Sequence, residues 1–220
     1  MSDALHGIET WVFDLDNTLY PATSTVYPEV EERMNRFIMT ELKLDLDAAI
    51  ALRKRFFAAH GTTLRGLMND YNMPPKPFLD FVHELDLSGL ARDEALGAAI
   101  GALPGRKLIF TNATERHAER VLAALGLDGH FCGIHDIEAC AFVPKPDPSG
   151  YHELLRRHAF DARRAAMVED MAKNLVPAAA LGMTTIWVKG GPHAEAGDEA
   201  AQHIHHSVDD LAAFLRTAAP

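Results

Sequence analysis

Cysteine is almost absent from this sequence, since Cys132 and Cys140 are the only two among 220 residues. Small secreted scaffolds that depend on disulfides carry several closely spaced cysteines. The separation of these two along the chain also does not match the paired spacing of a metal-binding motif. We therefore expect neither a disulfide framework nor a cysteine-based metal site, and we expect both thiols to be reduced.

Long apolar runs are missing as well. A membrane-spanning helix needs about 20 consecutive apolar residues, and no stretch of the sequence approaches this length. Residues 1–9 lack the basic start and the apolar centre of a secretory signal peptide. These features predict a cytoplasmic protein with no membrane partner.

Positive charge is in the minority. The 21 lysines and arginines face 31 aspartates and glutamates, which gives a formal net charge of −10 at pH 7. A surface of this charge repels both nucleic acids and acidic membranes, so a nucleic acid polymer is not an expected partner. An anionic substrate would have to be small, and local positive charge from a metal or a few basic side chains would have to hold it.

The rest of the composition is that of an ordinary globular protein, with 48% hydrophobic and 24% charged residues. A chain of 220 residues can bury a sizeable core, as one large domain or two small ones. We find no internal repeat and no low-complexity segment. The oligomeric state cannot be predicted from these features.

The most informative stretch is WVFDLDNTLY, residues 11–20. A short apolar run over residues 11–13 ends abruptly at Asp14 and Asp16, as a buried parallel strand does when it gives way to a polar loop. Ligands bind beyond the carboxyl ends of such strands. Two carboxylates so close together are costly to bury without a cation. Asp14 could therefore be a metal ligand or a nucleophile, and Asp16 an acid/base or a second ligand.

The same tripeptide, Asp-Leu-Asp, recurs at residues 45–47, which limits what the pattern alone can mean. No strand precedes this second copy, and helix-forming residues follow it over 48–59. There we expect the acidic pair to begin a helix and to complement its dipole. The apolar strand before Asp14 distinguishes the first copy.

Helix-like segments fill most of the chain between residues 25 and 102, and no strand interrupts them. So long an insertion after one strand exceeds an ordinary crossover, which predicts a helical cap domain. We assign residues 21–104 to this cap, and residues 1–20 and 105–220 to a catalytic core. The expected cap helices cover residues 26–39, 46–59, 63–71, 77–84 and 93–102.

Strands and helices alternate after residue 104, which predicts an α/β fold with a doubly wound parallel sheet. The expected strands cover residues 107–110, 133–136, 165–168 and 184–188. The expected helices cover residues 115–126, 148–158, 172–181 and 208–216. Between the last strand and the last helix, we expect the histidine-rich stretch 203–206 to be a solvated loop.

Polar side chains directly follow three of the predicted strands. They are Asp14 and Asp16, Thr111 and Asn112, and Glu169 and Asp170. Because the carboxyl ends of parallel strands meet at one edge of the sheet, we expect these side chains to share a site.

These residues, together with Lys145 in the run VPKPD and with Asn174, closely resemble the four motifs of the haloacid dehalogenase-like superfamily. The order of the motifs and their structural context agree as well, over residues 8–188. The resemblance implies a Rossmann-like core with an inserted helical cap, and a Mg²⁺-dependent phosphoryl transfer on a small phosphorylated metabolite.

The resemblance also implies roles for the catalytic residues. Asp14 would attack phosphorus and form an aspartyl-phosphate, and Asp16 would protonate the leaving oxygen and then activate water. Dehalogenating relatives lack the second aspartate, so Asp16 favours a phosphatase. Thr111, through its hydroxyl, and Asn112, through its backbone N–H, would bind phosphoryl oxygens. Lys145 would offset the negative charge.

The implied Mg²⁺ ligands are the carboxylates of Asp14 and Asp170 and the backbone carbonyl of Asp16. Glu169 would bind the metal directly or through water, and we expect Asp170 to be the direct ligand of this pair. Asn174 would orient the loop through hydrogen bonds.

For the substrate, the run FDLDNTLYP and the segment 61–67 resemble the pyrimidine 5′-nucleotidase branch, which implies hydrolysis of UMP and CMP. The alternatives are a phosphatase for a sugar phosphate, phosphoglycolate or another small metabolite, and a silent binding or regulatory protein on the same fold. Arg65 could contact the substrate or lie on a helix surface. Tyr20 could stack on a base or anchor the hinge.

Overall fold

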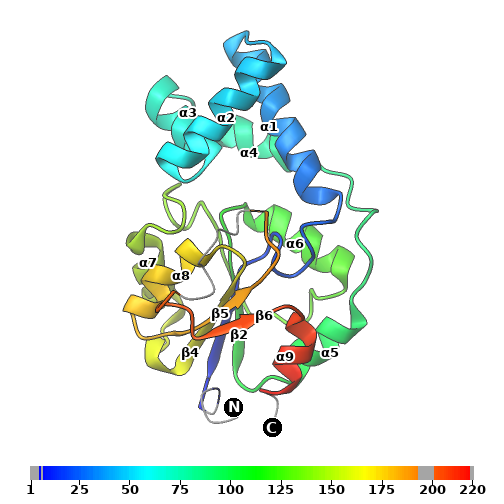
Figure 1. Cartoon of the computed structure of the whole chain (residues 1–220), viewed down its shortest axis with the longest axis vertical. Coiled ribbons are helices and arrows are strands. Elements are labelled where there is room, and N and C mark those ends of the chain that lie inside the picture. Colours follow the sequence, from blue (N-terminus) through cyan, green and yellow to red (C-terminus); the bar gives the residue numbers. More distant parts are fainter. Residues whose placement is uncertain (1–4, 6, 193–200, 219–220) are drawn as a thin grey trace.

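The computed structural model describes residues 5, 7–192 and 201–218, so the outer ends of the predicted core, at 1–4 and 219–220, lie outside the described residues. The chain forms two lobes, a helical lobe above and a sheet with flanking helices below (Figure 1). Within the described residues, no helix combines the length and the apolarity needed to cross a membrane.

The lower lobe is built on a sheet of six strands in the order β3-β2-β1-β4-β5-β6, and every neighbouring pair is parallel. This confirms the predicted α/β fold with a parallel sheet. The first strand lies between its neighbours and is buried at all four positions, as its continuous apolar run predicts. The strands are β1 (Thr10–Phe13), β2 (Arg106–Phe110), β3 (Ile134–His135), β4 (Ala165–Glu169), β5 (Thr184–Val188) and β6 (His206–Val208).

Helices cover both faces of this sheet. Because side chains alternate along a strand, Trp11 and Phe13 enter the apolar cluster on one face, and Val12 enters the cluster on the other. The first cluster includes side chains of α5 (Glu94–Ala102), α6 (Glu115–Leu125) and α9 (Leu211–Arg216). The second includes side chains of α7 (Pro148–His158) and α8 (Ala172–Ala180), and a short 3₁₀ helix, η2 (Ala162–Arg164), precedes β4.

The upper lobe consists of four helices, α1 (Val26–Leu42), α2 (Leu46–His60), α3 (Thr63–Tyr71) and α4 (Pro75–Val82). They enclose an apolar cluster that includes Phe37, Phe56 and Phe78 and is joined by Ile137 of the lower lobe. Val26 and Val30, at the start of α1, pack in the first cluster of the lower lobe instead. The second Asp-Leu-Asp copy begins α2 as expected, because the side chain of Asp45 accepts a hydrogen bond from the N–H of Ala48.

Helix α5 does not belong to the upper lobe, although we assigned residues 21–104 to the cap. It packs against α9, and Leu96, Ala99 and Ile100 join the apolar cluster beneath the sheet. Helical periodicity identifies an apolar face but not the surface that covers it, so the sequence could not separate α5 from α1–α4. We propose that the cap comprises α1–α4 and that the boundary lies between α4 and α5.

The end of the chain also differs from the prediction. Residues 206–208 form the edge strand β6, which pairs with β5, and the last helix starts only at Leu211. The predicted solvated loop over 203–206 is correct only in part, since His205 is exposed and lies outside any strand, but His206 belongs to β6. Within this loop, His205 accepts a hydrogen bond from the N–H of Thr185 at 2.9 Å. A strand of three residues with two polar members carries no alternation from which it could be recognised.

Gly66 sets the approach of α3 to α2. A Cβ placed at Gly66 would lie 2.6 Å from the Cβ of the fully buried Phe56. We expect Gly66→Ala to lower the free energy of unfolding by about 1–3 kcal/mol through overpacking, despite the better helix propensity of alanine. Gly129→Ala is the control, because a Cβ there meets nothing within 4 Å. Urea unfolding of both variants tests this, and equal stability would contradict it.

Candidate active site

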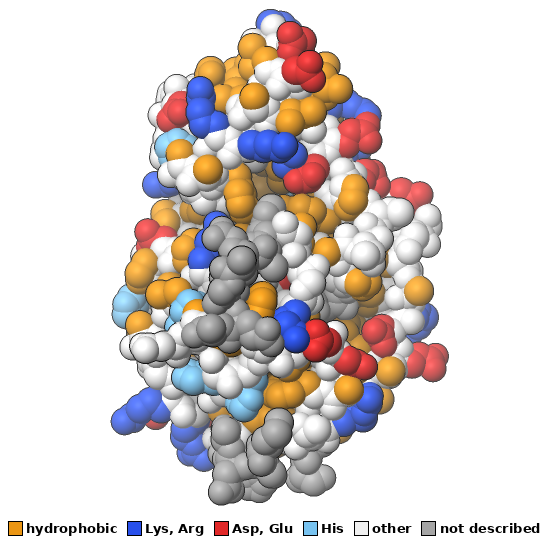
Figure 2. Space-filling view, in the orientation of Figure 1, with side chains coloured by type: hydrophobic (Ala, Val, Ile, Leu, Met, Phe, Trp, Pro, Cys, Tyr) orange, Lys and Arg blue, Asp and Glu red, His pale blue; other side chains and the backbone are white. Residues whose placement is uncertain are grey.

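The carboxyl ends of β1, β2 and β4 meet beneath the cap, where a cavity of about 370 Å³ lies between the two lobes. Figure 2 shows a recess between the lobes, bordered on the cap side by basic and acidic side chains. Eight of the residues predicted from the sequence line this cavity. They are Asp14, Asp16, Thr111, Asn112, Lys145, Glu169, Asp170 and Asn174.

Lys145 lies at the centre of the site with its side chain 1% exposed. Its Nζ donates to Asp14 Oδ1 at 2.6 Å, to Glu169 Oε2 at 2.7 Å and to the carbonyl of Phe110 at 2.8 Å. All three protons of the ammonium group are therefore used. Burial alone would lower the pKa of Lys145, but the two carboxylates outweigh it and raise the pKa, so the side chain is charged.

Three carboxyl groups crowd beside this ammonium group. Carboxyl oxygens of Asp14, Glu169 and Asp170 lie within 4.8 Å of one another, and all three residues are buried. Burial first, and then the neighbouring Glu169 carboxylate, raise the pKa values of Asp14 and Asp170. One lysine thus leaves an excess of negative charge in this part of the site.

The acidic cluster fits a divalent cation. Oδ2 of Asp170 is buried and has no hydrogen-bond partner among the described residues, whereas both oxygens of Glu169 already accept, from Lys145 and from the N–H of Met171. Carboxylate and carbonyl oxygens are the ligands that Mg²⁺ prefers. A cation here would stabilise the ionised carboxylates and give the unpartnered oxygen a ligand role.

Asp16 lies in a different electrostatic environment from Asp14. Its Oδ1 accepts from the Tyr20 hydroxyl at 2.6 Å and lies 3.0 Å from Nε2 of His117. Burial raises the pKa of Asp16, but His117 and Tyr20 together outweigh it and lower the pKa below its usual value. Neighbouring aspartates with opposite pKa shifts are suited to different chemical roles.

The turn after β1 brings the two aspartates together. Asn17 adopts a left-handed backbone with φ 65°, which asparagine tolerates better than most residues. The chain then turns back, so that the N–H of Thr18 bonds the carbonyl of Leu15. The Thr18 hydroxyl donates to Asp14 Oδ2 at 3.1 Å. Both oxygens of Asp14 are therefore held.

The loop after β2 supplies donors to the cavity. The side-chain oxygen of Asn112 accepts from the backbone N–H of Lys145 at 2.8 Å, which fixes the lysine loop. The Thr111 hydroxyl oxygen accepts from the N–H of Ala113 at 3.0 Å. Within the described residues, the backbone N–H of Asn112 has no hydrogen-bond partner. This N–H is available to a ligand.

The two other residues singled out from the sequence do not line this cavity. Arg65 borders a separate groove formed by α3 and the loop 143–147. Tyr20 is buried beneath Asp16 and supports its carboxylate. Tyr20 thus acts at the catalytic loop, which is closer to the anchoring role than to base stacking.

Several residues near the site were missed from the sequence. His117 contacts Asp16, and on the cap side Glu31 and Arg53 line the cavity as an ion pair at 2.5 Å. Glu31 and Arg53 have no sequence signal, because each fits an amphipathic helix. His117 could have been suspected from its position in the first turn of the helix that follows Thr111 and Asn112.

Lys145→Met should leave the buried carboxylates of Asp14 and Glu169 without their cation. We expect the free energy of unfolding in EDTA to fall by about 3 kcal/mol, as for other broken buried ion pairs. The control is Lys76→Met, which removes an exposed pair with Asp80 and should cost less than about 1 kcal/mol. Urea unfolding of both variants measures the difference, and equal losses would refute it.

Asp170→Asn should abolish stabilisation by Mg²⁺. A cation bound at 100 times its Kd stabilises the native state by about 2.7 kcal/mol, so Mg²⁺ should raise the Tm of the wild type but not that of this variant. Asp80→Asn, on the exposed surface of α4, should keep the full response. Thermal unfolding with Mg²⁺ and with EDTA is the measurement. An unchanged response in Asp170→Asn would exclude this residue as a ligand.

Comparison with known sequences finds a family model and two named relatives that match most of the chain. The model of the haloacid dehalogenase-like hydrolases matches residues 8–182. The chain is 27% identical over 194 residues to phosphate metabolism protein 8 of Saccharomyces cerevisiae, with 80% of this chain and 60% of that protein covered. It is 29% identical over 199 residues to a phosphoglycolate phosphatase of Mesorhizobium japonicum, with 82% of each chain covered. The chain thus spans less than two thirds of the yeast protein.

Solved structures share the fold. An L-2-haloacid dehalogenase from Xanthobacter autotrophicus superposes with a TM-score of 0.61 at 16% identity, covering 95% of this chain and 97% of that chain. A haloacid dehalogenase-like family hydrolase from Streptococcus pneumoniae superposes with a TM-score of 0.64 at 13% identity, covering 95% of this chain and 97% of that chain. With the family model matching most of its length, the chain belongs to the haloacid dehalogenase-like hydrolases.

Proposed function

We propose that the protein is a Mg²⁺-dependent phosphatase that hydrolyses phosphate monoesters of small metabolites through an aspartyl-phosphate on Asp14. The observation that carries the proposal is the pair of aspartates on one turn. Asp14 is held by Lys145 and Thr18 at the floor of the cavity, and Asp16 is held independently by Tyr20 and His117. A nucleophile and a separate acid/base are what two-step ester hydrolysis requires.

In the first step, the Asp14 carboxylate attacks phosphorus, the bond from phosphorus to the ester oxygen breaks, and Asp16 gives a proton to the leaving oxygen. In the second step, Asp16 takes a proton from water, the water oxygen attacks phosphorus, and the bond to Asp14 breaks. Phosphate leaves and the carboxylate is regenerated. The pKa of Asp16 in the free enzyme is lowered, so Asp16 has to take up a proton, from solvent or from a monoanionic ester, before it can give one to the leaving oxygen.

Lys145, Thr111 and Asn112 serve the phosphoryl group in this proposal. The Lys145 ammonium group and the free N–H of Asn112 would offset the charge of the phosphoryl oxygens, and the Thr111 hydroxyl would bind one of them. Mg²⁺, when bound, neutralises charge on the phosphoryl group and on its own carboxylate ligands.

The proposed metal ligands are the Asp14 and Asp170 carboxylates and the Asp16 carbonyl. The unpartnered Oδ2 of Asp170 supports a direct role for this residue, and the two engaged oxygens of Glu169 support an indirect role for Glu169. Asn174 is buried beside the site, and its Oδ1 has no partner among the residues that the structure describes; in this proposal Asn174 would orient the loop.

For the substrate, the names of the relatives favour a small ester that is not a nucleotide, such as phosphoglycolate or a sugar phosphate, over a pyrimidine nucleotide. One of them is named a phosphoglycolate phosphatase, and neither has a nucleotidase name. Nucleotides such as UMP and CMP stay a second candidate because of the size of the cavity. Its volume of about 370 Å³ falls within the ~300–1,000 Å³ of sites that hold larger organic ligands.

Phosphate release from phosphoglycolate, a sugar phosphate, UMP, CMP and AMP tests the activity and the substrate together. We expect release to require Mg²⁺ and to stop in EDTA. Asp14→Asn should reduce the rate by on the order of 10⁴-fold or more, as for other lost nucleophiles. Asp45→Asn, in the second Asp-Leu-Asp copy, should leave the rate unchanged because asparagine also caps helices well.

Each outcome of this panel has a definite meaning. Release from UMP and CMP alone would establish the nucleotidase alternative, and release from phosphoglycolate or a sugar phosphate would overturn it. No release from any ester, with a stable fold and intact Mg²⁺ binding, would favour the silent binding protein over both phosphatase proposals.

A further inference from the structure

The Asp16 carboxylate is held at one oxygen only. Tyr20 and His117 both approach Oδ1, and within the described residues Oδ2 has no hydrogen bond. The side chain is 25% exposed and lines the cavity. Two donors on one oxygen fix the plane of the carboxylate and leave the other oxygen to exchange a proton with a ligand.

His117 is one of these two donors, and its burial needs an explanation. The residue lies in the first turn of α6, after the N-cap Thr114, and its side chain is 1% exposed. Nε2 bonds Asp16 across 101 positions of sequence, while Nδ1 is buried and has no partner in the described part of the chain. An unpaired buried nitrogen costs about 1–3 kcal/mol, so an apolar residue would serve packing better.

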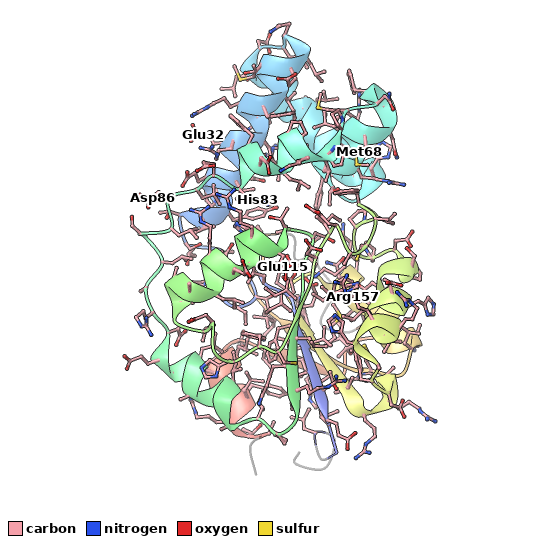
Figure 3. The ribbon with its side chains drawn as sticks, turned by 180° about the vertical axis from the view of Figure 1, so that it is seen from behind. Glu32, Met68, His83, Asp86, Glu115 and Arg157 are labelled. Atoms are coloured by element: carbon pink, nitrogen blue, oxygen red, sulfur yellow. The ribbon has the colours of Figure 1, made fainter. Side chains whose placement is uncertain are left out.

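His83, the C-cap of α4, holds His117 from the side of the cap. The two imidazole rings stack with centroids 4.5 Å apart and an interplanar angle of 23°. His83 Nδ1 lies 3.2 Å from the Thr114 hydroxyl. Burial first, and then His117, lower the pKa of His83 to about 3, so it stacks as a neutral ring. Figure 3 shows His83 where the cap meets the start of α6, near Glu115.

The backbone around His83 is fastened to the same helix. The Arg120 guanidinium donates to the carbonyls of His83 and Leu85 at 2.7 and 2.6 Å. The end of the cap helix α4 is therefore clamped on α6, one turn from the residue that reaches Asp16. The position of the imidazole stack depends on both lobes.

We propose that His117 is a positioning residue that orients the Asp16 carboxylate for proton transfer, and that His83 keeps His117 in place when the cap lies on the core. This inference rests on the proposed acid/base role of Asp16. It adds a chain of contacts from the cap, through two histidines, to the group that handles the proton.

The test compares two esters that differ in their need for a general acid. An alkyl phosphate requires protonation of its leaving oxygen, whereas p-nitrophenolate leaves without it. His117→Met resembles the imidazole in bulk and has no donor, and His117→Gln keeps an N–H at the end of the side chain. His152→Met, at an exposed site on α7, is the control. We would measure kcat and KM for both esters in each variant.

We expect His117→Met to lower kcat/KM for the alkyl phosphate by about 10²-fold, in the range for lost general acid catalysis. The loss with p-nitrophenyl phosphate should be under about tenfold, and KM should stay near that of the wild type. His117→Gln should recover most of the alkyl phosphate activity. His83→Phe, which keeps a ring but loses Nδ1, should show the same selective loss to a smaller extent.

Equal losses on both esters, or no difference between His117→Gln and His117→Met, would overturn the positioning role. If His117→Met does not fold, as judged by its thermal unfolding, His83→Phe decides by the same ratio of the two esters. A wild type that hydrolyses neither ester would instead overturn the phosphatase proposal. The two failures are therefore distinguishable.

Discussion

The site depends on one buried cation placed among more negative charge than it can neutralise. Lys145 donates its three protons to Asp14, to Glu169 and to the carbonyl of Phe110, and so joins the carboxyl ends of β1, β4 and β2. Charges this deeply buried are tolerated only when they are paired and hydrogen-bonded. Burial and Glu169 raise the pKa of Asp170, and a cation beside the three crowded carboxyl groups would favour the ionised form, which is the physical reason for a metal at this edge of the sheet.

Asp14 and Asp16 have the same side chain, and their different proposed roles follow from the groups that surround each carboxylate. Asp14 shares its surroundings with other carboxylates, whereas Asp16 faces a phenol and an imidazole. In an extended strand, side chains two positions apart point to the same face, but Asp14 and Asp16 lie beyond the end of β1 and reach different neighbours. The turn at Asn17 makes this possible without a longer loop.

Much of the fold and the floor of the site could be predicted because both depend on local pattern. Apolar runs identified β1, β2, β4 and β5, and the polar residues after them converge as the parallel sheet requires. The parts that could not be predicted depend on contacts between distant segments. His117 contacts Asp16 across 101 positions of sequence. Helix α5 packs in the cluster of the lower lobe and not in the cap, and β6 forms by pairing with the edge of β5.

The separate apolar cluster of α1–α4 has a consequence for how such a protein can change over evolutionary time. A lobe with its own interior can accumulate substitutions, or be replaced, while the sheet beneath it keeps its packing. New leaving groups could then be accommodated with the same reaction steps. The exceptions are the contacts that cross between the lobes, where substitutions on the two sides must remain compatible. They include Val26 and Val30 of α1, which pack in the cluster of the lower lobe, and the contacts of His83 and Arg120.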